Sequence, residues 1–369
     1  MEAAHDGPPR GRASTPEAGR DPASRIAVWQ TRSGRHELPW QATHDPYRIW
    51  LSETMLQQTQ ANTVIPYYQD FLARFPDVRA LADAPLDAVL HAWAGLGYYA
   101  RARNLHRCAQ VVCDVHGGRF PSNAAGLAEL PGIGPSTAAA IAAFAYGERA
   151  AILDGNVRRV LARHQGLEAD PGTSASTRQL WTWAREWLAR SPPDLDMRAY
   201  TQGQMDLGAT VCTRTNPDCA HCPLADDCMA RIQGRQHELP RARARRQQPL
   251  QSCHLLIVQH GTDVLLQRRP ERGIWGGLWS LPQFETQGQM ADFCPGLPSG
   301  TSTPEKLAAF DHVFTHFRLH LQPWLLRISG NPVLTAPPGH AWVSVQTLRD
   351  RGMPTPVARL LAGLYPDQT

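Results

Sequence analysis

Apolar residues recur every three or four positions between residues 25 and 233, which is the spacing of amphipathic helices. No segment before residue 250 has the apolar–polar alternation that is typical of a strand, so this part is predicted to be all-α. The predicted helices are Ile26–Gln30, Pro46–Gln57, Val64–Arg74, Leu86–Ala94, Ala100–His116, Ala124–Glu129, Pro135–Tyr146, Val157–His164, Trp181–Leu188 and Thr201–Ala209.

The pattern changes near residue 250. Residues 234–250 are basic and rich in Pro and Gln, which indicates a linker. The runs beyond them predict a separate α+β domain over residues 251–369, with a hairpin turn at Gly261-Thr-Asp263. Its predicted strands are His254–Gln259, Thr262–Arg268, His312–His320 and Trp324–Ile328, and its predicted helices are Val345–Asp350 and Val357–Leu364. Residues 1–24 are rich in Pro, Gly, Ala and Arg and are predicted to be disordered.

The composition is that of a globular, mildly basic protein. Apolar residues make up 42% of the 369 positions, which allows a sizeable core, and the formal net charge of +4 suits nucleic acid without requiring it. No apolar run approaches the roughly 20 residues of a membrane span. The start of the chain also lacks the apolar stretch of a secretory signal, so a cytoplasmic location without a membrane partner is expected.

The segment Leu130-Pro-Gly-Ile-Gly-Pro-Ser-Thr-Ala138 is typical of a helix, a tight turn and a second helix. Pro131, Gly132 and Gly134 interrupt the helical pattern, because proline and glycine favour turns. The free N–H groups of the second helix can hold a phosphate oxygen. An ordinary Gly-Pro turn between two helices is the alternative explanation.

Two carboxylates stand out along the chain. Asp154 lies on a short loop within Ile152-Leu-Asp-Gly-Asn-Val157, just ahead of a predicted helix. Glu53 lies on a predicted helix among Trp50 and Met55, whereas a lone helical glutamate is more often solvated surface. Partial burial would raise the pKa of such a carboxyl group, which is what a general acid near neutral pH requires.

The segment Gly95-Leu-Gly-Tyr-Tyr-Ala-Arg-Ala-Arg-Asn104 presents two aromatic and two arginine side chains at one turn. The simplest interpretation is a helix connection with tyrosines in the core. The functional interpretation is a wedge for the minor groove, with an aromatic ring pushing on the base stack and arginines on the backbone.

Four of the eight cysteines, Cys212, Cys219, Cys222 and Cys228, follow the spacing C-x6-C-x2-C-x5-C. A disulfide framework is not expected in a long chain without a secretory signal. Thiolates this close favour a metal centre, and the spacing alone suits either zinc or a [4Fe–4S] cluster. Arg214 lies in the polar loop between the first two cysteines and could contact a phosphate.

Several motifs occur in a specific order: Leu38-Pro-Trp40, Leu51–Gln60, Gly95–Asn104, the hairpin at about 124–146, Leu153–Val157, Met205-Asp-Leu-Gly208 and the four cysteines. Over residues 25–369 the chain thereby resembles the MutY family of adenine DNA glycosylases, within the helix-hairpin-helix/GPD superfamily. The resemblance implies a multidomain protein with a two-lobed, all-α glycosylase domain at residues 25–233. It also implies one [4Fe–4S] cluster per chain, rather than zinc, in the loop 212–228.

The resemblance implies roles for individual residues. Glu53 matches the acid that protonates adenine at N7, and Asp154 matches the carboxylate that stabilises the cationic sugar. Ser136 and Asn156 would hold Asp154 or a water molecule. The DNA-binding positions are Gln58, Tyr98, Gly132, Gly134 and Arg214, and the adenine-pocket positions are Leu38, Trp40, Met205 and Asp206.

Residues 251–369 resemble the Nudix-like domain of the family, through Gly273-Ile-Trp-Gly-Gly-Leu-Trp279 and Phe314-Thr315-His316. This region lacks the glutamate-rich metal-binding helix of a Nudix hydrolase, so the resemblance implies recognition of 8-oxoguanine by Phe314, Thr315 and His316. Thr315 replaces the serine that is usual in the family. Gln41 stands where some relatives carry arginine.

The implied partner is double-stranded DNA that contains an A·8-oxoguanine or A·G mismatch, bound by a monomer. Bifunctional relatives place a lysine where this chain has Ser136, so a monofunctional glycosylase is expected. Three alternatives remain: a superfamily glycosylase for thymine mismatches or oxidised pyrimidines, a non-catalytic DNA-binding protein with a metal cluster, and a Nudix hydrolase with a helical accessory domain.

Overall fold

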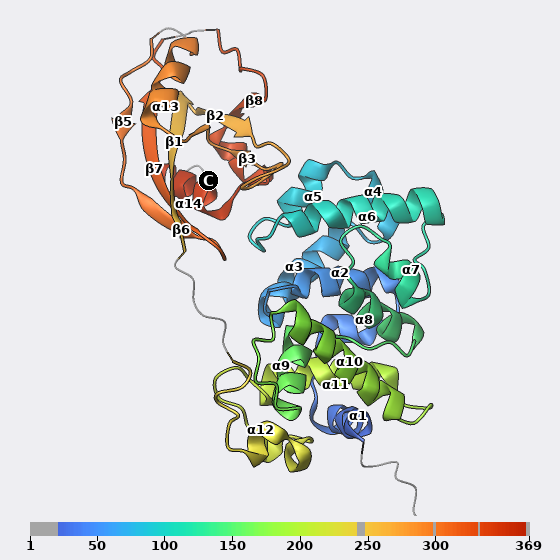
Figure 1. Cartoon of the computed structure of the whole chain (residues 1–369). Helices are drawn as coiled ribbons and strands as arrows, with labels where there is room; N and C mark the ends of the chain where they lie inside the picture. The colour runs from blue at the N-terminus through green and yellow to red at the C-terminus, as the bar shows by residue number, and fades with distance from the viewer. Residues whose placement is uncertain (1–20, 242–247, 298–299, 331–332, 367–369) are drawn as a thin grey trace, which may run out of the picture. The chain divides into compact units, whose positions relative to one another are not determined.

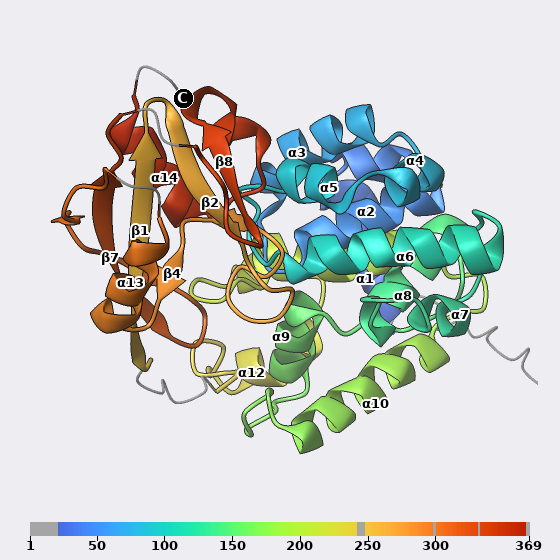
Figure 2. The ribbon, with the colours of Figure 1, turned by 90° about the horizontal axis from the view of Figure 1, so that it is seen from above.

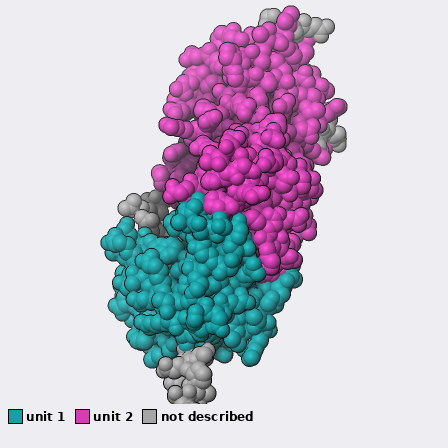
Figure 3. All heavy atoms as spheres, turned by 90° about the vertical axis from the view of Figure 1, so that its right-hand side faces the viewer, with its two compact units in different colours: residues 1–37, 122–128, 134–243 teal, residues 38–121, 129–133, 244–369 magenta. Residues whose placement is uncertain are grey.

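The computed structural model describes residues 21–241, 248–297, 300–330 and 333–366. The chain divides into two compact units, coloured separately in Figure 3. Unit 1 comprises residues 1–37, 122–128 and 134–243, and unit 2 comprises residues 38–121, 129–133 and 244–369. The predicted helical domain therefore contributes to both units. Residues 1–20 of the predicted tail and 242–247 of the predicted linker lie outside the described residues.

Unit 1 is helical in its described residues (Figure 1). Its elements are α1 (Pro22–Ser33), α7 (Ala124–Ala128), α8 (Pro135–Tyr146), α9 (Gly155–His164), α10 (Ser174–Arg190), α11 (Met197–Asp206), a π-helical turn (Leu207–Val211), 3-10 turns (Cys219–His221 and Ala225–Asp227) and α12 (Met229–Ile232). Side-chain caps define where several helices begin, because Asp21, Thr173 and Asp196 each accept a backbone N–H of the first turn.

The core of unit 1 is built from small residues of α8 and larger ones of its neighbours. Ala139, Ala140 and Ala143 of α8 are buried, and they belong to the same cluster as Leu161 of α9 and Trp187 of α10. Small side chains at a helix contact allow the backbones to approach closely. The hairpin helix α8 is therefore packed as a central element of this unit.

The first part of unit 2 is also helical. It contains a 3-10 turn (Pro39–Ala42), α2 (Pro46–Leu56), α3 (Ala61–Arg74), α4 (Val78–Asp83), α5 (Leu86–Ala92) and α6 (Ala100–His116). Asp45 and Asp77 cap α2 and α4 through their side chains. Trp50, Phe71 and Trp93 are almost completely buried and supply much of the apolar core.

Residues 250–366 of unit 2 form a mixed sheet with helices (Figure 2). The elements are β1 (Leu250–His260), β2 (Asp263–Arg268), β3 (Trp279–Ser280), β4 (Gln283–Phe284), α13 (Gln287–Phe293), a 3-10 turn (Cys294–Gly296), β5 (Glu305–Lys306), β6 (Phe310–Val313), β7 (Arg318–Arg327), β8 (His340–Ser344), a 3-10 turn (Val345–Asp350) and α14 (Thr355–Leu364).

The sheet follows the order β3-β2-β1-β7-β5, with β4, β6 and β8 pairing to β1, β7 and β2. Its central pair, β1 and β7, is parallel, and the register runs from Leu250 opposite Arg318 to Gln259 opposite Arg327. Leu256 and Val258 point to one face because strand side chains alternate. Met290 of α13 joins them in an apolar cluster that covers this face.

The structure corrects several predicted boundaries. The predicted strand His312–His320 is wrong, because the chain reverses between β6 and β7 and Phe314 donates its N–H to the Phe317 carbonyl at 2.9 Å. Residues of the predicted strand Trp324–Ile328 belong to the longer β7. Helix α4 was not predicted, and α1 begins at Pro22, inside the predicted tail. Among the described residues, no strand precedes β1, as expected.

Candidate active site and cysteine cluster

The hairpin turn between α7 and α8 depends on one glycine. Gly132 has a φ of +78°, and a Cβ atom there would lie 2.7 Å from the Cβ of Asn104. Both the backbone conformation and the space therefore require glycine. Gly134 is different, since its backbone is extended and a Cβ would meet nothing within 4 Å. Gly134 is the N-cap of α8 and makes no side-chain cap, so it leaves the first-turn N–H groups accessible to a ligand.

Asp154 is held at the N-terminus of α9. Its Oδ1 accepts the N–H of Val157 at 2.7 Å, which makes Asp154 the N-cap of the helix. Desolvation raises the pKa of this carboxyl group, although the backbone N–H groups of Val157 and Asn156 and the positive charge of Arg159 oppose the rise. The site thus keeps a carboxyl group that is costly to ionise and is surrounded by groups that favour the anion.

Ser136 acts on Asp154 through the backbone. Its Oγ accepts the N–H of Leu153 at 2.9 Å, which ties the first turn of α8 to the residue before Asp154. A lysine at position 136 could not accept this hydrogen bond, because its ammonium group has donors only. The predicted interaction of Ser136 with Asp154 is therefore indirect in the structure.

Asn156 is connected to the cysteine loop by an arginine that the sequence did not single out. Arg159 donates from Nη2 to Asn156 Oδ1 at 2.8 Å and to the Gly208 carbonyl at 2.6 Å, and from Nε to the Cys212 carbonyl at 2.8 Å. A Cβ atom on Gly208 would lie 2.5 Å from the Cβ of Asn156. The π-helical turn after α11 therefore packs directly against the start of α9.

The remaining predicted acid and DNA-contact residues lie in unit 2. Glu53 is half-buried on α2. Gln58 follows the end of α2 with a φ of +59°, and Tyr98 precedes α6 with a φ of +50°. Both side chains are exposed. Non-glycine residues in this region of backbone space are uncommon and often mark functional positions.

The predicted adenine-pocket residues lie in two different settings. Leu38 and Trp40 of unit 2 are each 7% exposed, and the Trp40 ring meets the edge of Tyr68 at 5.6 Å between ring centroids. In unit 1, Met205 packs against the core while Asp206 is completely buried. The Asp206 carboxylate binds the Arg35 guanidinium at 2.6 Å, so it is charge-paired.

The predicted recognition residues Phe314, Thr315 and His316 form the reversal between β6 and β7. The Phe314 ring stacks against Phe317, with 4.4 Å between ring centroids, and is tilted relative to the ring of Trp275 at 6.0 Å. Thr315 and His316 are exposed. The Thr315 Oγ1 lies 3.1 Å from the Tyr98 hydroxyl, so the structure brings two of the predicted DNA-contact residues together.

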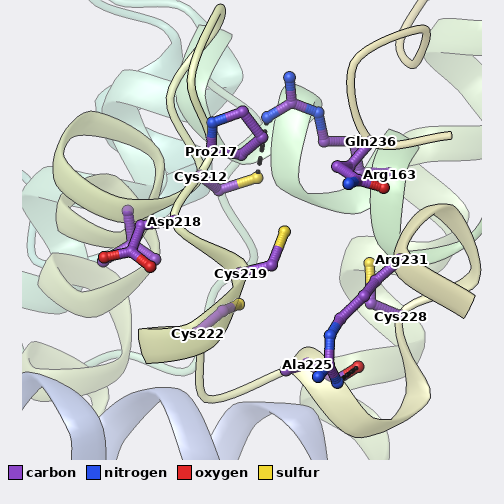
Figure 4. A pocket seen from close by; sticks show the side chains of 11 residues that line it. Arg163, Cys212, Pro217, Asp218, Cys219, Cys222, Ala225, Cys228, Arg231 and Gln236 are labelled. Atoms are coloured by element: carbon purple, nitrogen blue, oxygen red, sulfur yellow. Dashed lines mark hydrogen bonds between the residues drawn. The ribbon is translucent and has the colours of Figure 1, made fainter. Parts of the chain in front are cut away.

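The four clustered cysteines line one hollow of about 310 Å³ that is partly open to solvent (Figure 4). All four are free thiols, and burial raises the pKa of Cys222 to about 12. Arg163 reaches the same hollow and donates to Cys212 Sγ at 3.3 Å and to the Thr213 carbonyl at 2.6 Å. Arg163 also donates to the carbonyl of Arg214, whose own side chain is exposed.

A metal group fits this hollow chemically. Buried thiols ionise only when positive charge compensates them, and Arg163 and Arg231 are the cations among the lining residues. Within the described residues, no three His, Cys, Asp or Glu side chains are arranged as a group that could hold a metal ion. The residue types, four thiols beside two arginines, still suit either a zinc ion or a [4Fe–4S] cluster.

Known proteins resemble this chain over nearly its whole length. Residues 51–186 match the HhH-GPD superfamily of base excision DNA repair proteins, and residues 253–363 match the NUDIX domain family. The adenine DNA glycosylase of Buchnera aphidicola subsp. Acyrthosiphon pisum is 33% identical over 340 residues, which cover 91% of this chain and 95% of that protein. The chain belongs to the adenine DNA glycosylase family.

Two further DNA glycosylases are similar to this chain. The human adenine DNA glycosylase is 30% identical over 399 residues, which cover 91% of this chain and 72% of the human protein. The solved structure of a thermostable thymine-DNA glycosylase is 29% identical, with a TM-score of 0.51, and the match covers 57% of this chain and 95% of that one.

Membership of the family confirms several predictions. The chain is a DNA N-glycosylase of base excision repair, with a helical HhH-GPD domain followed by an α+β Nudix domain. Separately from the family, none of the helices in the described part of the chain combines the length and the apolar character of a membrane-spanning segment. The roles of individual residues stay predictions.

Proposed function

We propose that this family member flips adenine out of duplex DNA and hydrolyses its N-glycosidic bond when the base opposite is 8-oxoguanine or guanine. The observation that carries the proposal is the 33% identity to an adenine DNA glycosylase over 91% of the chain. The desolvated Asp154 beside the hairpin helix supports it. Because its substrate is chromosomal DNA, the enzyme is proposed to act in the cytoplasm, on the nucleoid, as a monomer.

Glu53 is the proposed general acid. Adenine is a poor leaving group until it is protonated, and a carboxyl group that donates a proton to N7 removes this obstacle. Glu53 lies half-buried on α2, so its carboxyl group is partly shielded from solvent. Leu38, Trp40, Met205 and Asp206 are proposed to form the pocket for the flipped base. Asp206 also pairs with Arg35.

Asp154 is the proposed stabiliser of the cationic sugar. Loss of the base leaves an oxocarbenium-like sugar, and an anion fixed nearby lowers the free energy of that state. Desolvation strengthens the attraction because few water molecules screen it. Ser136 fixes the backbone at Leu153, and Asn156 is fixed by Arg159, so the two flanking residues hold the loop in place. A water molecule completes the hydrolysis.

The reaction is proposed to be monofunctional. A bifunctional glycosylase uses an amine to form a Schiff base with the sugar, and Ser136 offers only a hydroxyl group that already accepts the Leu153 N–H. The wild-type enzyme should therefore leave abasic strands intact. Ser136→Lys should give detectable borohydride trapping on DNA, and equally efficient trapping of the wild type would contradict the assignment.

DNA binding is proposed to use three features. The N–H groups of α8 beyond Gly132 and Gly134 hold a phosphate. Gln58 and Tyr98 enter the base stack, and Arg214 contacts the backbone near the cysteine loop. Phe314, Thr315 and His316 are proposed to recognise 8-oxoguanine in the opposite strand.

The four cysteines are proposed to hold one [4Fe–4S] cluster. Membership of the adenine DNA glycosylase family supports a cluster over a single zinc ion, and the four thiols that line one hollow supply its ligands. Its contribution is structural, since it would fix the loop that carries Arg214 and that accepts hydrogen bonds from Arg159 and Arg163. Anaerobically purified protein should contain about four irons per chain. Stoichiometric zinc without iron would exclude this assignment.

One set of duplexes tests the proposed function. Adenine or thymine is placed opposite guanine or 8-oxoguanine, and release of each base is measured in single turnover. Adenine opposite 8-oxoguanine should react fastest, and Glu53→Gln should abolish release while leaving duplex affinity nearly unchanged. The likeness to a thymine-DNA glycosylase makes thymine release the alternative. Preferential removal of thymine opposite guanine would support that alternative.

A further inference from the structure

Two exposed side chains of unit 2 are placed by unusual backbone geometry. Gln58 and Tyr98 have φ angles of +59° and +50°, in the left-handed region that favours glycine. Gln58 lies in the turn after α2, and Tyr98 lies in the turn before α6. A non-glycine residue stays in this region only when its surroundings hold it there. The structure must therefore contain interactions that fix both turns.

Arg101 supplies interactions to both turns. From the first turn of α6, Nη1 donates to the carbonyls of Thr54, Met55 and Gln57 at 3.0, 2.7 and 2.6 Å. These carbonyls end α2 and lead directly into the turn at Gln58. Helix C-termini leave their last carbonyls without intrahelical donors, and a cation there is favourable.

The other terminal nitrogen of Arg101 joins the second turn. Nη2 donates to the carbonyls of Leu96 and Gly97 at 3.3 Å each and to the Thr59 hydroxyl at 3.2 Å. The guanidinium carbon also lies 5.5 Å from the centroid of the Tyr98 ring. One side chain thus contacts the residues on both sides of Gln58 and those that precede Tyr98.

The environment of Arg101 suits a structural clamp rather than a phosphate contact. Its residue is only 9% exposed, and the guanidinium also lies 5.3 Å from the Trp93 ring centroid. All six of its hydrogen-bond acceptors are neutral oxygens, namely five backbone carbonyls and one hydroxyl. Burial lowers the pKa of Arg101 to about 10, so it remains a cation at neutral pH.

We propose that Arg101 is a positioning residue for base flipping, which clamps the turns at Gln58 and Tyr98 so that both side chains enter the duplex together. The proposal rests on the proposed function, in which these two residues enter the base stack. Arg101 itself contacts neither DNA nor the reacting atoms. Its loss should therefore impair extrusion of adenine and leave the chemical step nearly intact.

The test compares two substrates for Arg101→Met. The first is a fully paired duplex around A·8-oxoguanine, and the second has mismatched pairs on both sides of that site, so that little unstacking is needed. On the first, the single-turnover rate should fall at least about tenfold, because displaced groups lose alignment. On the second, the rate should stay within about twofold of the wild type.

Several variants make the result decisive. Arg107→Met removes an exposed arginine from the same helix and should behave as the wild type on both substrates. Arg101→Lys keeps the charge with fewer donors and should give an intermediate defect on the paired duplex alone, and it replaces Arg101→Met if that variant does not fold. Glu53→Gln should be inactive on both substrates, and activity there would refute the proposed function instead. An equal loss on both duplexes, or no loss on either, would overturn the role of Arg101.

Discussion

The carboxyl group of Asp154 combines a catalytic role with an energetic cost. Its pKa is raised in the folded protein, so folding favours its protonated form. The contribution of Asp154 to stability is therefore favourable below its unfolded pKa and is lost as the pH rises through the folded pKa. At neutral pH the ionised group lowers the free energy of unfolding relative to a neutral side chain.

Asp154→Asn should separate these two effects. Asparagine keeps an acceptor for the Val157 N–H and remains neutral, so the free energy of unfolding at pH 7 should equal or exceed that of the wild type. The rate of adenine release should fall at least about 10²-fold, because the anion is lost. Denaturant titration at pH 7 and pH 5 checks this, and the difference from the wild type should shrink at the lower pH. A less stable variant at pH 7 would contradict the cost assigned to Asp154.

The pH dependence of catalysis has the same origin. If ionised Asp154 is required, the single-turnover rate falls as the pH is lowered through its raised pKa. The acid limb of the rate profile should therefore lie above the pH at which an ordinary exposed aspartate titrates. A profile that is flat down to the usual aspartate range would argue that Asp154 need not be ionised.

Ser136 offers a second test at the scale of one hydrogen bond. Ser136→Ala leaves the N–H of Leu153, a residue that is 5% exposed, without its acceptor. The free energy of unfolding should fall by about 1–3 kcal/mol, and adenine release should slow because Asp154 follows Leu153. Thr137→Ala is the matched control, since it truncates the next hydroxyl residue of the same helix. Equal unfolding free energies and equal rates of adenine release for the two variants would contradict the positioning role of Ser136.

At the scale of elements, the π-helical turn can pack against α9 because position 208 is a glycine. Gly208→Ala should lower the free energy of unfolding by about 1–3 kcal/mol and slow adenine release, because its Cβ would lie 2.5 Å from that of Asn156. Gly363→Ala in α14 is the control, since its Cβ meets nothing within 4 Å and alanine favours helix. Urea titration of both variants measures the difference. If Gly208→Ala changed neither the free energy of unfolding nor the rate of adenine release, the position of α9 would not matter for stability or catalysis.

The helices were predictable where apolar spacing and caps agree. Asp45 with Pro46 defines where α2 begins, and the Ala-rich run of α8 ends at Gly147. The reversal at Phe314 was not predictable, because its apolar and aromatic residues have the composition of a strand. Phe314 stacks on Phe317 there and has a tilted ring contact with Trp275, which lies 39 residues earlier in the chain.

Only those residues of the candidate site whose own side chain is proposed to react or to bind a metal could be predicted from the sequence. Glu53, Asp154 and the cysteines were identified from residue type and motif. Arg159 was not identified, and Arg101 was expected on the DNA backbone, whereas it is buried and donates to protein carbonyls. The carbonyls that these two arginines contact belong to segments distant in sequence or to turns whose shape is unknown beforehand. Hydrogen bonds to such distant carbonyls produce no periodic pattern in the amino-acid sequence from which they could be predicted.

At the scale of the molecule, residues 250–366 are joined to the helical part of unit 2 by polar contacts. Arg103 donates to the Gly276 carbonyl at 2.6 Å, the Tyr99 hydroxyl donates to the Met353 carbonyl at 3.1 Å, and Arg268 pairs with Asp87 at 2.7 Å. Removal of this domain therefore deletes more than the proposed recognition residues.

Truncation at Gln251 should leave an enzyme that binds its cluster and removes adenine, with a weaker preference for 8-oxoguanine over guanine opposite adenine. The preference should fall by roughly 5- to 150-fold, since a good set of polar base contacts is worth about 1–3 kcal/mol. Thr315→Ala combined with His316→Ala should reproduce part of this loss of preference. The double variant keeps the other polar contacts between residues 250–366 and the helical part of unit 2. The ratio of single-turnover rates on the two duplexes is the measurement. An unchanged ratio would place lesion recognition in the helical part.

The parallel pairing of β1 with β7 has a consequence for the order in which the protein is made. Leu250 pairs with Arg318 and Gln259 with Arg327, so the two central strands emerge from the ribosome far apart in time. Until residue 327 has been synthesised, β1 has an open edge of unpaired backbone groups. Pairings of such long sequence separation also form slowly. The vulnerable interval for aggregation is thus late in translation, after the catalytic residues have been made.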